Sequence, residues 1–150
     1  MSLSATTRSA IERLVAQFPE RRSALLPALK LAQHEVGWLP PETIAETAEL
    51  VGVPHSAGLE IAEFYTMLHT EAVPSVQVVV CAQLPCALRG AEQLIRDLQS
   101  ALDGDSIEVE RTSECFGACH RAPMARVGDQ YYENLDDDGR QRLIAELRKA

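Results

Sequence analysis

Apolar residues recur at intervals of three and four positions through the first half of the chain. This spacing predicts four helices, which run from about Ser9 to Pro19, from about Ser23 to Gly37, from Pro41 to Gly52 and from Ser56 to Tyr65. In the first helix, Ser9 and Glu12 have the spacing of a capping box. Proline and glycine residues mark ends of these helices. We therefore expect a small helical bundle over residues 1–72.

The pattern changes to a mixture of strands and helices near residue 76. In order, the chain is predicted to form a strand over residues 76–80, a helix over 88–102, a strand over 107–111, a hairpin over 124–133 and a helix around 143–147. Turns are predicted at Asp103-Gly104-Asp105 and at Gly128-Asp129. This β-α-β-β-β-α order is typical of the thioredoxin-like arrangement. The predicted fold class is therefore mixed (α+β or α/β), with a helical bundle, a linker near residues 71–75 and a thioredoxin-like domain over residues 73–150.

Composition narrows the possible functions. The 150 residues include 46% hydrophobic and 24% charged residues and carry a net charge of −8. An acidic chain of this kind is not expected to bind nucleic acid, because phosphate contacts require an excess of lysine and arginine. The longest apolar stretch, residues 78–82, is far shorter than the ~20 residues that span a bilayer. We expect a cytoplasmic protein without direct membrane insertion, which reaches a membrane only through partners.

Four cysteines provide the candidate chemistry, and all lie in the second half of the chain. Cys81 follows the first strand and Cys86 lies before the helix, while Cys115 and Cys119 lie between the second strand and the hairpin. If the first two strands are parallel neighbours, their carboxyl ends share one edge of the sheet and the two pairs converge there. Four thiolates from two loops are the ligand set of a [2Fe–2S] cluster or of a zinc ion.

Three interpretations compete with a [2Fe–2S] cluster. Structural zinc most often uses C-x₂-C pairs, whereas the spacings here are C-x₄-C and C-x₃-C. A thioredoxin-type dithiol needs C-x-x-C at a helix start, and this spacing is absent. Buried structural cysteines prefer the interiors of strands and helices to loops that contain glycine and proline. The spacing and placement therefore favour the [2Fe–2S] cluster.

The surroundings of the cysteines are compatible with an anionic cluster. Gly117, between Cys115 and Cys119, leaves room for backbone N–H groups to turn towards the sulfurs. Between residues 111 and 126 three arginines stand against one glutamate, either as a local positive excess beside the cluster or as side chains that face water or a partner. No G-x-G-x-x-G motif and no Ser-His-Asp set occurs, so we expect no nucleotide site and no catalytic residues in this chain.

Five short motifs resemble the small [2Fe–2S] subunit of bacterial respiratory complex I, NADH:quinone oxidoreductase. They are EFYTM at residues 63–67, LPCALRG at 84–90, ECFGAC at 114–119, APM at 122–124 and YYE at 131–133. The resemblance implies an electron-transfer subunit with one [2Fe–2S] cluster on Cys81, Cys86, Cys115 and Cys119. It also implies a helical bundle that docks on a partner subunit, and this flavoprotein, not the present chain, carries FMN and binds NADH. The chain would then lie at the inner membrane as a peripheral part of the complex.

Two other functions stay open at this point. Related subunits of the gamma type occur in NAD-dependent formate dehydrogenases and NAD-reducing hydrogenases, and they share the cysteine framework. A zinc-stabilised interaction module would use the same four cysteines without electron transfer.

Overall fold

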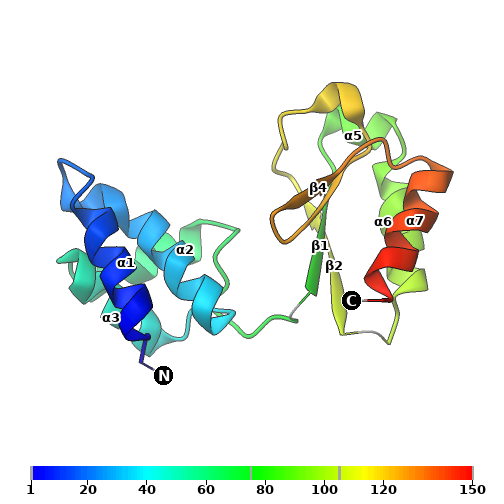
Figure 1. Ribbon diagram of the computed structural model, residues 1–150. Helices are drawn as coiled ribbons and strands as arrows, with labels where there is room; N and C mark the ends of the chain where they lie inside the picture. Colours follow the sequence, from blue (N-terminus) through cyan, green and yellow to red (C-terminus); the bar gives the residue numbers. More distant parts are fainter. Residues whose placement is uncertain (1, 75, 105, 150) are drawn as a thin grey trace. The chain divides into compact units, whose positions relative to one another are not determined.

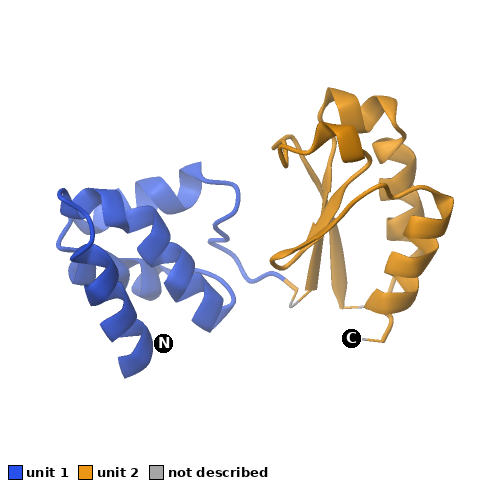
Figure 2. Cartoon of the chain, turned by 45° about the horizontal axis from the view of Figure 1, so that its top comes forward, with its two compact units in different colours: residues 1–73 blue, residues 74–150 orange. Residues whose placement is uncertain are grey.

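The structure is a computed structural model that describes residues 2–74, 76–104 and 106–149. The chain divides into two compact units, residues 1–73 and residues 74–150 (Figure 2). Each unit has a hydrophobic core of its own. Ser75 of the predicted linker and Asp105 of the predicted turn lie outside the described residues.

The first unit is built from helices. They are α1 (Ala5–Val15), the 3₁₀ helix η1 (Arg21–Ala24), α2 (Leu25–Val36), α3 (Pro41–Val51) and α4 (His55–Phe64), as Figure 1 shows. The core of the unit consists of apolar side chains from these helices, among them the fully buried Ile11, Leu29 and Val51. Gly37 and Gly52 end α2 and α3 at positive φ, where glycine has no steric penalty. The predicted helical bundle is confirmed.

Two helix starts differ from the prediction. The capping box of Ser9 and Glu12 is wrong, because α1 begins earlier and its N-cap is Ser4, whose Oγ accepts the Thr7 N–H at 3.2 Å. The α4 helix also begins before the predicted start at Ser56, since its first residue is His55 and its N-cap residue is Pro54. In α1 the apolar spacing begins only at Ile11, because most residues of the first turns are exposed and polar. The spacing of apolar residues cannot reveal helical turns whose residues are exposed and polar.

The second unit is a four-stranded sheet with helices. Its elements are β1 (Val76–Cys81), α5 (Leu84–Leu88), α6 (Ala91–Ala101), β2 (Ile107–Thr112), the 3₁₀ helix η2 (Cys119–Arg121), β3 (Ala125–Val127), β4 (Gln130–Tyr132) and α7 (Asp137–Leu147). The strand order is β2-β1-β3-β4, with β1 parallel to β2 and antiparallel to β3. The helices α6 and α7 lie on the same side of the sheet (Figure 1). Their buried leucines pack with Val78 and Val80 of β1 to form the core.

The predicted helix over residues 88–102 is two helices in the structure. Gly90 adopts φ +95° and separates α5 from α6. Leu88 therefore belongs to α5, where 78% of it is exposed, and does not contribute to the buried face of α6. The spacing from Leu88 to Ala91 mimics one continuous helical face, and only the left-handed glycine interrupts it. The break places Cys86 inside a separate short helix.

The hairpin and the last helix follow the prediction. Val127 and Gln130 pair across the turn, and Gly128 takes φ +55°. Arg140 of α7 forms ion pairs with Asp97 of α6 at 2.5 Å and with Asp137 at 3.0 Å.

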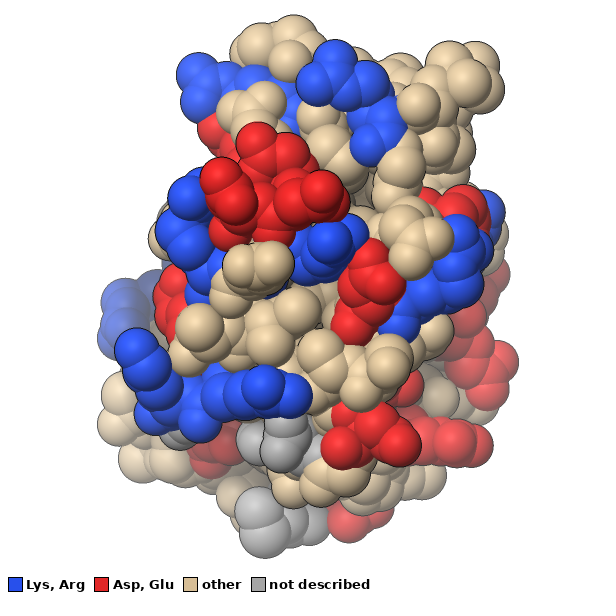
Figure 3. All heavy atoms as spheres, turned by 90° about the vertical axis from the view of Figure 1, so that its right-hand side faces the viewer, with Lys and Arg blue, Asp and Glu red and all other residues tan. Residues whose placement is uncertain are grey.

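Viewed from the side of α6 and α7, basic and acidic side chains are intermixed over the surface (Figure 3). Among the described residues, no helix has the length and apolar character needed to cross a membrane.

Candidate metal centre

The carboxyl ends of β1 and β2 lie side by side. The two strands are parallel neighbours, with Cys81 opposite Thr112 at the end of the register. The N–H of Ala82 donates to the Thr112 carbonyl oxygen at 2.9 Å and extends the pairing by one residue. The two loops that carry the cysteines therefore leave the sheet at the same edge, as the sequence predicted for parallel neighbours.

The first pair of cysteines, Cys81 and Cys86, is buried. Each is 2% exposed, Cys81 at the end of β1 and Cys86 in α5. The Cys81 N–H donates to the Met124 carbonyl oxygen at 3.1 Å, which ties the first loop to the segment before β3. Burial, followed by the hydrogen bond with the Cys81 thiol, raises the pKa of Cys86 to about 11. In the absence of a cation Cys86 is therefore a neutral thiol, and a bound metal would replace its proton.

The second pair, Cys115 and Cys119, is exposed. The two Sγ atoms lie 3.6 Å apart. The Gly117 N–H donates to the Cys115 Sγ at 3.4 Å, and this bond, followed by the bond from the Cys119 thiol, lowers the pKa of Cys115. The same thiol–thiol hydrogen bond is the largest cause that raises the pKa of Cys119. Between these two sulfurs the hydrogen bonds therefore favour the thiolate at Cys115 over the thiolate at Cys119.

The sulfur distance in the second pair matches that of two ligands on one metal ion. A tetrahedral metal with thiolate bonds of about 2.3 Å holds two sulfurs about 3.8 Å apart. Gly117, at φ +78°, has open space where a Cβ would stand, and its N–H points at a sulfur. The loop is therefore arranged for a thiolate ligand without rearrangement of Gly117.

The two thiol pairs affect each other electrostatically, but they do not surround one common metal position. The charge of Cys81 contributes to the raised pKa of Cys119, and the charge of Cys119 contributes to that of Cys86. In the part of the chain that the structure describes, no three His, Cys, Asp or Glu side chains are placed to hold a single metal ion. The arrangement is therefore two thiol pairs at one sheet edge.

Contacts around the second pair involve residues to which the sequence gave no role. The rings of Phe116 and Tyr131 meet edge to face, with centroids 5.4 Å apart and planes at 73°, so that the second loop rests on β4. The Thr112 Oγ1 accepts the Glu114 N–H at 3.1 Å and turns the chain as it leaves β2. No local pattern marks these contacts, because they join residues that are distant in sequence or depend on a strand end.

The predicted positive excess near the cysteines is largely compensated in space. Arg111 pairs with Glu92 of α6 at 3.1 Å, and Arg121 pairs with Glu133. Arg126 donates to the Gly128 carbonyl oxygen at 2.7 Å. The acidic partners come from outside residues 111–126, so the local sequence does not show the compensation.

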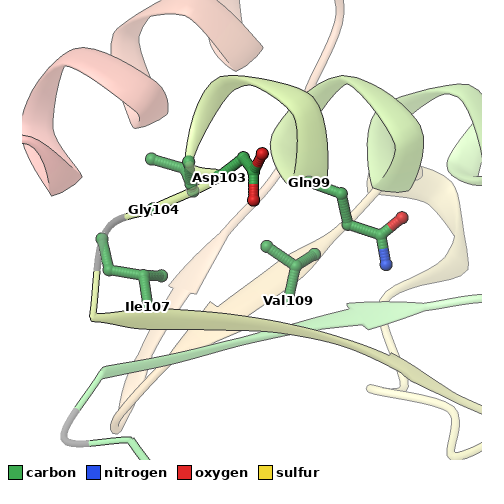
Figure 4. A pocket seen from close by; sticks show the side chains of 6 residues that line it. Gln99, Asp103, Gly104, Ile107 and Val109 are labelled. Carbon is green, nitrogen blue, oxygen red and sulfur yellow. The ribbon is translucent and has the colours of Figure 1, made fainter.

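A separate pocket lies at the other end of β2. It has a volume of about 300 Å³, and its lining residues come from the C-terminal end of α6, the following turn and the start of β2 (Figure 4). Ile107 and Val109 of β2 line it, whereas the cysteine loops follow the opposite end of the strand, at Thr112. The pocket is therefore not part of the candidate metal centre.

A thioredoxin-like sheet with two thiol pairs at one edge defines a class of small metal-binding proteins. The chain belongs to the thioredoxin-like [2Fe–2S] ferredoxin family, whose model matches residues 11–148. It is 38% identical to an NADH-quinone oxidoreductase subunit of Rhizobium meliloti (strain 1021), over 97% of this chain and 90% of the relative. It is 34% identical to an NADH-quinone oxidoreductase subunit of Rickettsia bellii (strain RML369-C), over 93% of this chain and 90% of the relative.

A solved structure is similar to the chain in fold. This is the NAD⁺-reducing [NiFe]-hydrogenase in the H₂-reduced state, with a TM-score of 0.69 and 22% identity over 83% of this chain. The present chain spans 22% of that hydrogenase chain. The predicted fold class and the predicted family are both confirmed.

Proposed function

We propose that the chain carries one [2Fe–2S] cluster on Cys81, Cys86, Cys115 and Cys119 and transfers single electrons as a subunit of NADH:quinone oxidoreductase. The observation that carries this proposal is the division of the four thiols into two pairs at one sheet edge. Family membership and the names of the relatives support the same conclusion.

Paired thiols favour a two-iron cluster over one zinc ion. In a [2Fe–2S] cluster each iron takes two protein ligands, so the thiolates arrive as two pairs. A single zinc ion needs all four sulfurs around one point. The four thiols here stand as two pairs, and in the second pair the Sγ atoms of Cys115 and Cys119 lie 3.6 Å apart. The pairs Cys81 with Cys86 and Cys115 with Cys119 are therefore assigned to one iron each.

The two cysteine pairs would give the two irons of the cluster different environments. The iron bound by Cys81 and Cys86 would lie at the apolar core, whereas the iron bound by Cys115 and Cys119 would lie at the surface. The Gly117 N–H supplies a hydrogen bond to the Cys115 sulfur, a contact that would stabilise a thiolate ligand and raise the reduction potential of a bound cluster. When bound, the cluster accepts and gives up one electron at a time. The exposed second pair is the end at which an electron can enter or leave.

The exposed apolar side chains of the second unit lie in α5, which contains Cys86, or contact the loop of the second pair. Among its described residues, the large exposed hydrophobic side chains are Leu84, Leu88 and Tyr131. Leu84 and Leu88 stand on either side of Cys86 in α5, and Tyr131 contacts Phe116 between the second pair. Apolar side chains are exposed at such a place when a partner covers them. We call these three side chains the apolar rim and assign it as the contact surface for the FMN-bearing, NADH-binding flavoprotein subunit. This partner fits because its flavin splits a hydride into single electrons, which the cluster can accept.

The helical unit is the second docking element in this proposal. Phe64, at the end of α4, is 76% exposed and meets Tyr65 edge to face, with centroids 5.2 Å apart. The first unit contains no cysteine and no part of the metal centre. Its role is therefore to hold the chain on the complex, which keeps it in the cytoplasm and peripheral to the inner membrane.

Metal and sulfide analysis tests the cluster. Anaerobically purified protein should contain about two irons and about two acid-labile sulfides per chain, and it should give an EPR signal only after reduction. Four irons per chain, or stoichiometric zinc in native protein, would overturn the assignment. Stoichiometric zinc would instead identify a zinc-stabilised interaction module.

Binding to the flavoprotein tests the docking surface. The isolated chain should not be reduced by NADH, and it should become reducible when the FMN-bearing subunit is added. Leu88→Glu should weaken complex formation at least tenfold, because it places a charge in the apolar rim. Ala145→Glu, on the exposed surface of α7, adds the same charge elsewhere and should bind as the wild type does. Equal binding by all three proteins would remove the rim from the interface. Preferential binding to the flavin subunit of a formate dehydrogenase or hydrogenase would change the host complex.

A further inference from the structure

Backbone pairing between the two cysteine loops ends at the edge of the sheet. The last backbone hydrogen bond of this pair runs from the Ala82 N–H to the Thr112 carbonyl oxygen. Thr112 is 8% exposed, and its hydroxyl accepts the Glu114 N–H, which turns the chain as it leaves β2. The parallel register of β1 and β2 ends at the pair Cys81 and Thr112.

The side chain of Gln83 makes the next connection. Its Nε2 donates to the carbonyl oxygen of Ser113. Gln83 lies between Cys81 and Cys86, and Ser113 lies two residues before Cys115. This hydrogen bond therefore joins the loop of the first pair to the loop of the second.

Gln83 also holds the helix that contains Cys86. It is the N-cap residue of α5, and its carbonyl oxygen accepts the Ala87 N–H at 2.8 Å. Its side chain makes no capping hydrogen bond, so the amide group is available to reach Ser113. One residue thus contacts both loops, through its main chain on one side and its side chain on the other.

The cysteines of the second pair are not themselves buried, although Phe116 and Ala118 of their loop pack against the core. Cys115 and Cys119 are both exposed, in contrast to the buried first pair. The contact between Phe116 and Tyr131 fixes the middle of the second loop against β4. The bond from Gln83 fixes the start of that loop against the first loop.

We propose that Gln83 is a positioning residue for the metal centre: by binding the Ser113 carbonyl, it sets the separation of the two thiol pairs. This inference rests on the proposed function, because it assigns the two pairs to the two irons of one cluster. Loss of the bond leaves all four ligands in place but allows the second pair to move relative to the first. The consequence is an altered cluster environment and faster loss of iron.

The chain offers a matched control at the other end of the same strands. Gln77 of β1 donates through its Nε2 to Glu108 Oε2 of β2 at 3.1 Å. Like Gln83, it is a glutamine that links the β1 and β2 segments through its side chain, but it lies where the strands begin. A general effect on the sheet would appear in both variants, whereas an effect on the metal centre would appear only at Gln83.

The experiment compares Gln83→Leu, Gln83→Glu and Gln77→Leu in the full chain with the cluster bound. The measurements are the rate at which visible absorption is lost to an iron chelator, the EPR spectrum after reduction, and the far-UV circular dichroism. Gln83→Leu should lose its cluster about fivefold faster than the wild type, which corresponds to about 1 kcal/mol for one hydrogen bond. Gln83→Glu keeps the shape of the side chain without its donor, so it should lose the cluster at least as fast. Both should show a shifted or broadened EPR signal at unchanged helical content.

Gln77→Leu should retain the EPR spectrum and the chelation rate of the wild type. The inference is overturned if the Gln83 variants lose iron within twofold of the wild-type rate, or if Gln77→Leu changes as much as they do. A wild-type rate in Gln83→Glu alone would also overturn it, since side-chain packing would then explain the effect of leucine. These results would leave the proposed function intact. Absence of an iron cluster from the wild type would instead overturn the proposed function, and the role of Gln83 with it.

Discussion

At the scale of single residues, four identical side chains have different properties because their surroundings differ. Burial raises the pKa of Cys86 to about 11, whereas a backbone N–H lowers the pKa of Cys115 at the surface. Cys86 therefore stays protonated without a bound cation, whereas in the second pair the thiolate is favoured at Cys115. The residues of the second pair are the accessible ones for a metal donor.

Substitution of single cysteines should show which of the four bind the cluster. Cys86→Ser and Cys119→Ser should each lower cluster occupancy several-fold, because serine oxygen is a harder and poorer ligand for iron than thiolate. Thermal unfolding should show a less stable second unit and unchanged helices in the first unit. Ala87→Ser adds a hydroxyl beside Cys86 without removal of a thiol and should retain full visible absorption. A cysteine variant that retains full absorption as well would remove that cysteine from the ligand set.

Glu35 gives a prediction about pH at the same scale. Its carboxylate accepts the Ser4 N–H at 2.8 Å and the Ser4 hydroxyl at 2.9 Å. A hydrogen bond from the Thr7 side chain, followed by those from Ser4, lowers the pKa of Glu35. A carboxylate whose pKa is lower in the folded state stabilises the fold above its unfolded-state pKa, and this stabilisation is lost as the pH falls through the folded-state value.

Glu35→Gln should therefore destabilise the first unit at neutral pH by more than it does in acid. Urea unfolding of wild type and variant, followed by circular dichroism at about pH 7 and about pH 3.5, measures the difference. Glu12→Gln, at an exposed position of α1, should change stability little at either pH. A deficit for Glu35→Gln that stays constant or grows in acid would contradict the assignment of the carboxylate.

At the scale of elements, the ends of helices depend on partners from elsewhere in the chain. The α3 helix ends at Gly52, and Arg21 of η1 donates to the Val51 carbonyl oxygen at 2.7 Å and to that of Leu50 at 3.3 Å. A Cβ at position 52 would lie 2.8 Å from the Arg21 Nε. Gly52 therefore has two roles: it takes the left-handed conformation, and it leaves room for the guanidinium group.

Arg21→Met should reduce the free energy of unfolding of the first unit by about 1–2 kcal/mol, because it removes charged donors from carbonyl groups at a helix end. Arg22→Met is the matched control. Arg22 pairs with Glu60 at 3.4 Å with both side chains 68% exposed, and such pairs contribute about 0–1 kcal/mol. Chemical denaturation of the two variants distinguishes the residues. Equal losses would show that Arg21 does not stabilise the end of α3.

At the scale of the whole molecule, the chain consists of two units with separate cores. One core is made by helices alone, and the other lies between the sheet and the helices α6 and α7 (Figure 2). All four cysteines lie in the second unit, and the exposed Phe64 lies in the first. The proposed cluster and one docking surface therefore belong to the second unit, and the other docking element belongs to the first.

Fragments that correspond to the two units should fold independently. Residues 74–150 should assemble the cluster with about two irons, and residues 1–73 should be helical and colourless. The isolated second unit should bind the flavoprotein more weakly than the full chain, because Phe64 and its helix are missing. Full-length protein prepared in parallel serves as the control. Failure of fragment 74–150 to assemble a cluster would show that the first unit is needed for the metal centre.

The sequence alone determined the features that depend on local pattern. Helical spacing, the β-branched run of β1 and the glycines after α2 and α3 specify their elements, because neighbours within a few residues decide backbone conformation. The spacing of the cysteines was also sufficient to propose a cluster, but the expected loop placement was wrong for the first pair, since Cys81 ends β1 and Cys86 lies in α5. The same local signals failed where an element begins with exposed polar residues, as in α1, and where Gly90 interrupts an apolar pattern.

Only the tertiary structure decided how residues distant in sequence meet. It made β1 and β2 parallel neighbours, buried one thiol pair while it exposed the other, and paired Arg111 with Glu92. It also brought the Gln83 side chain to Ser113, thirty positions further along the chain. These contacts follow from the packing of the sheet, because burial and hydrogen bonding depend on neighbours in space, which the order of residues along one segment does not specify.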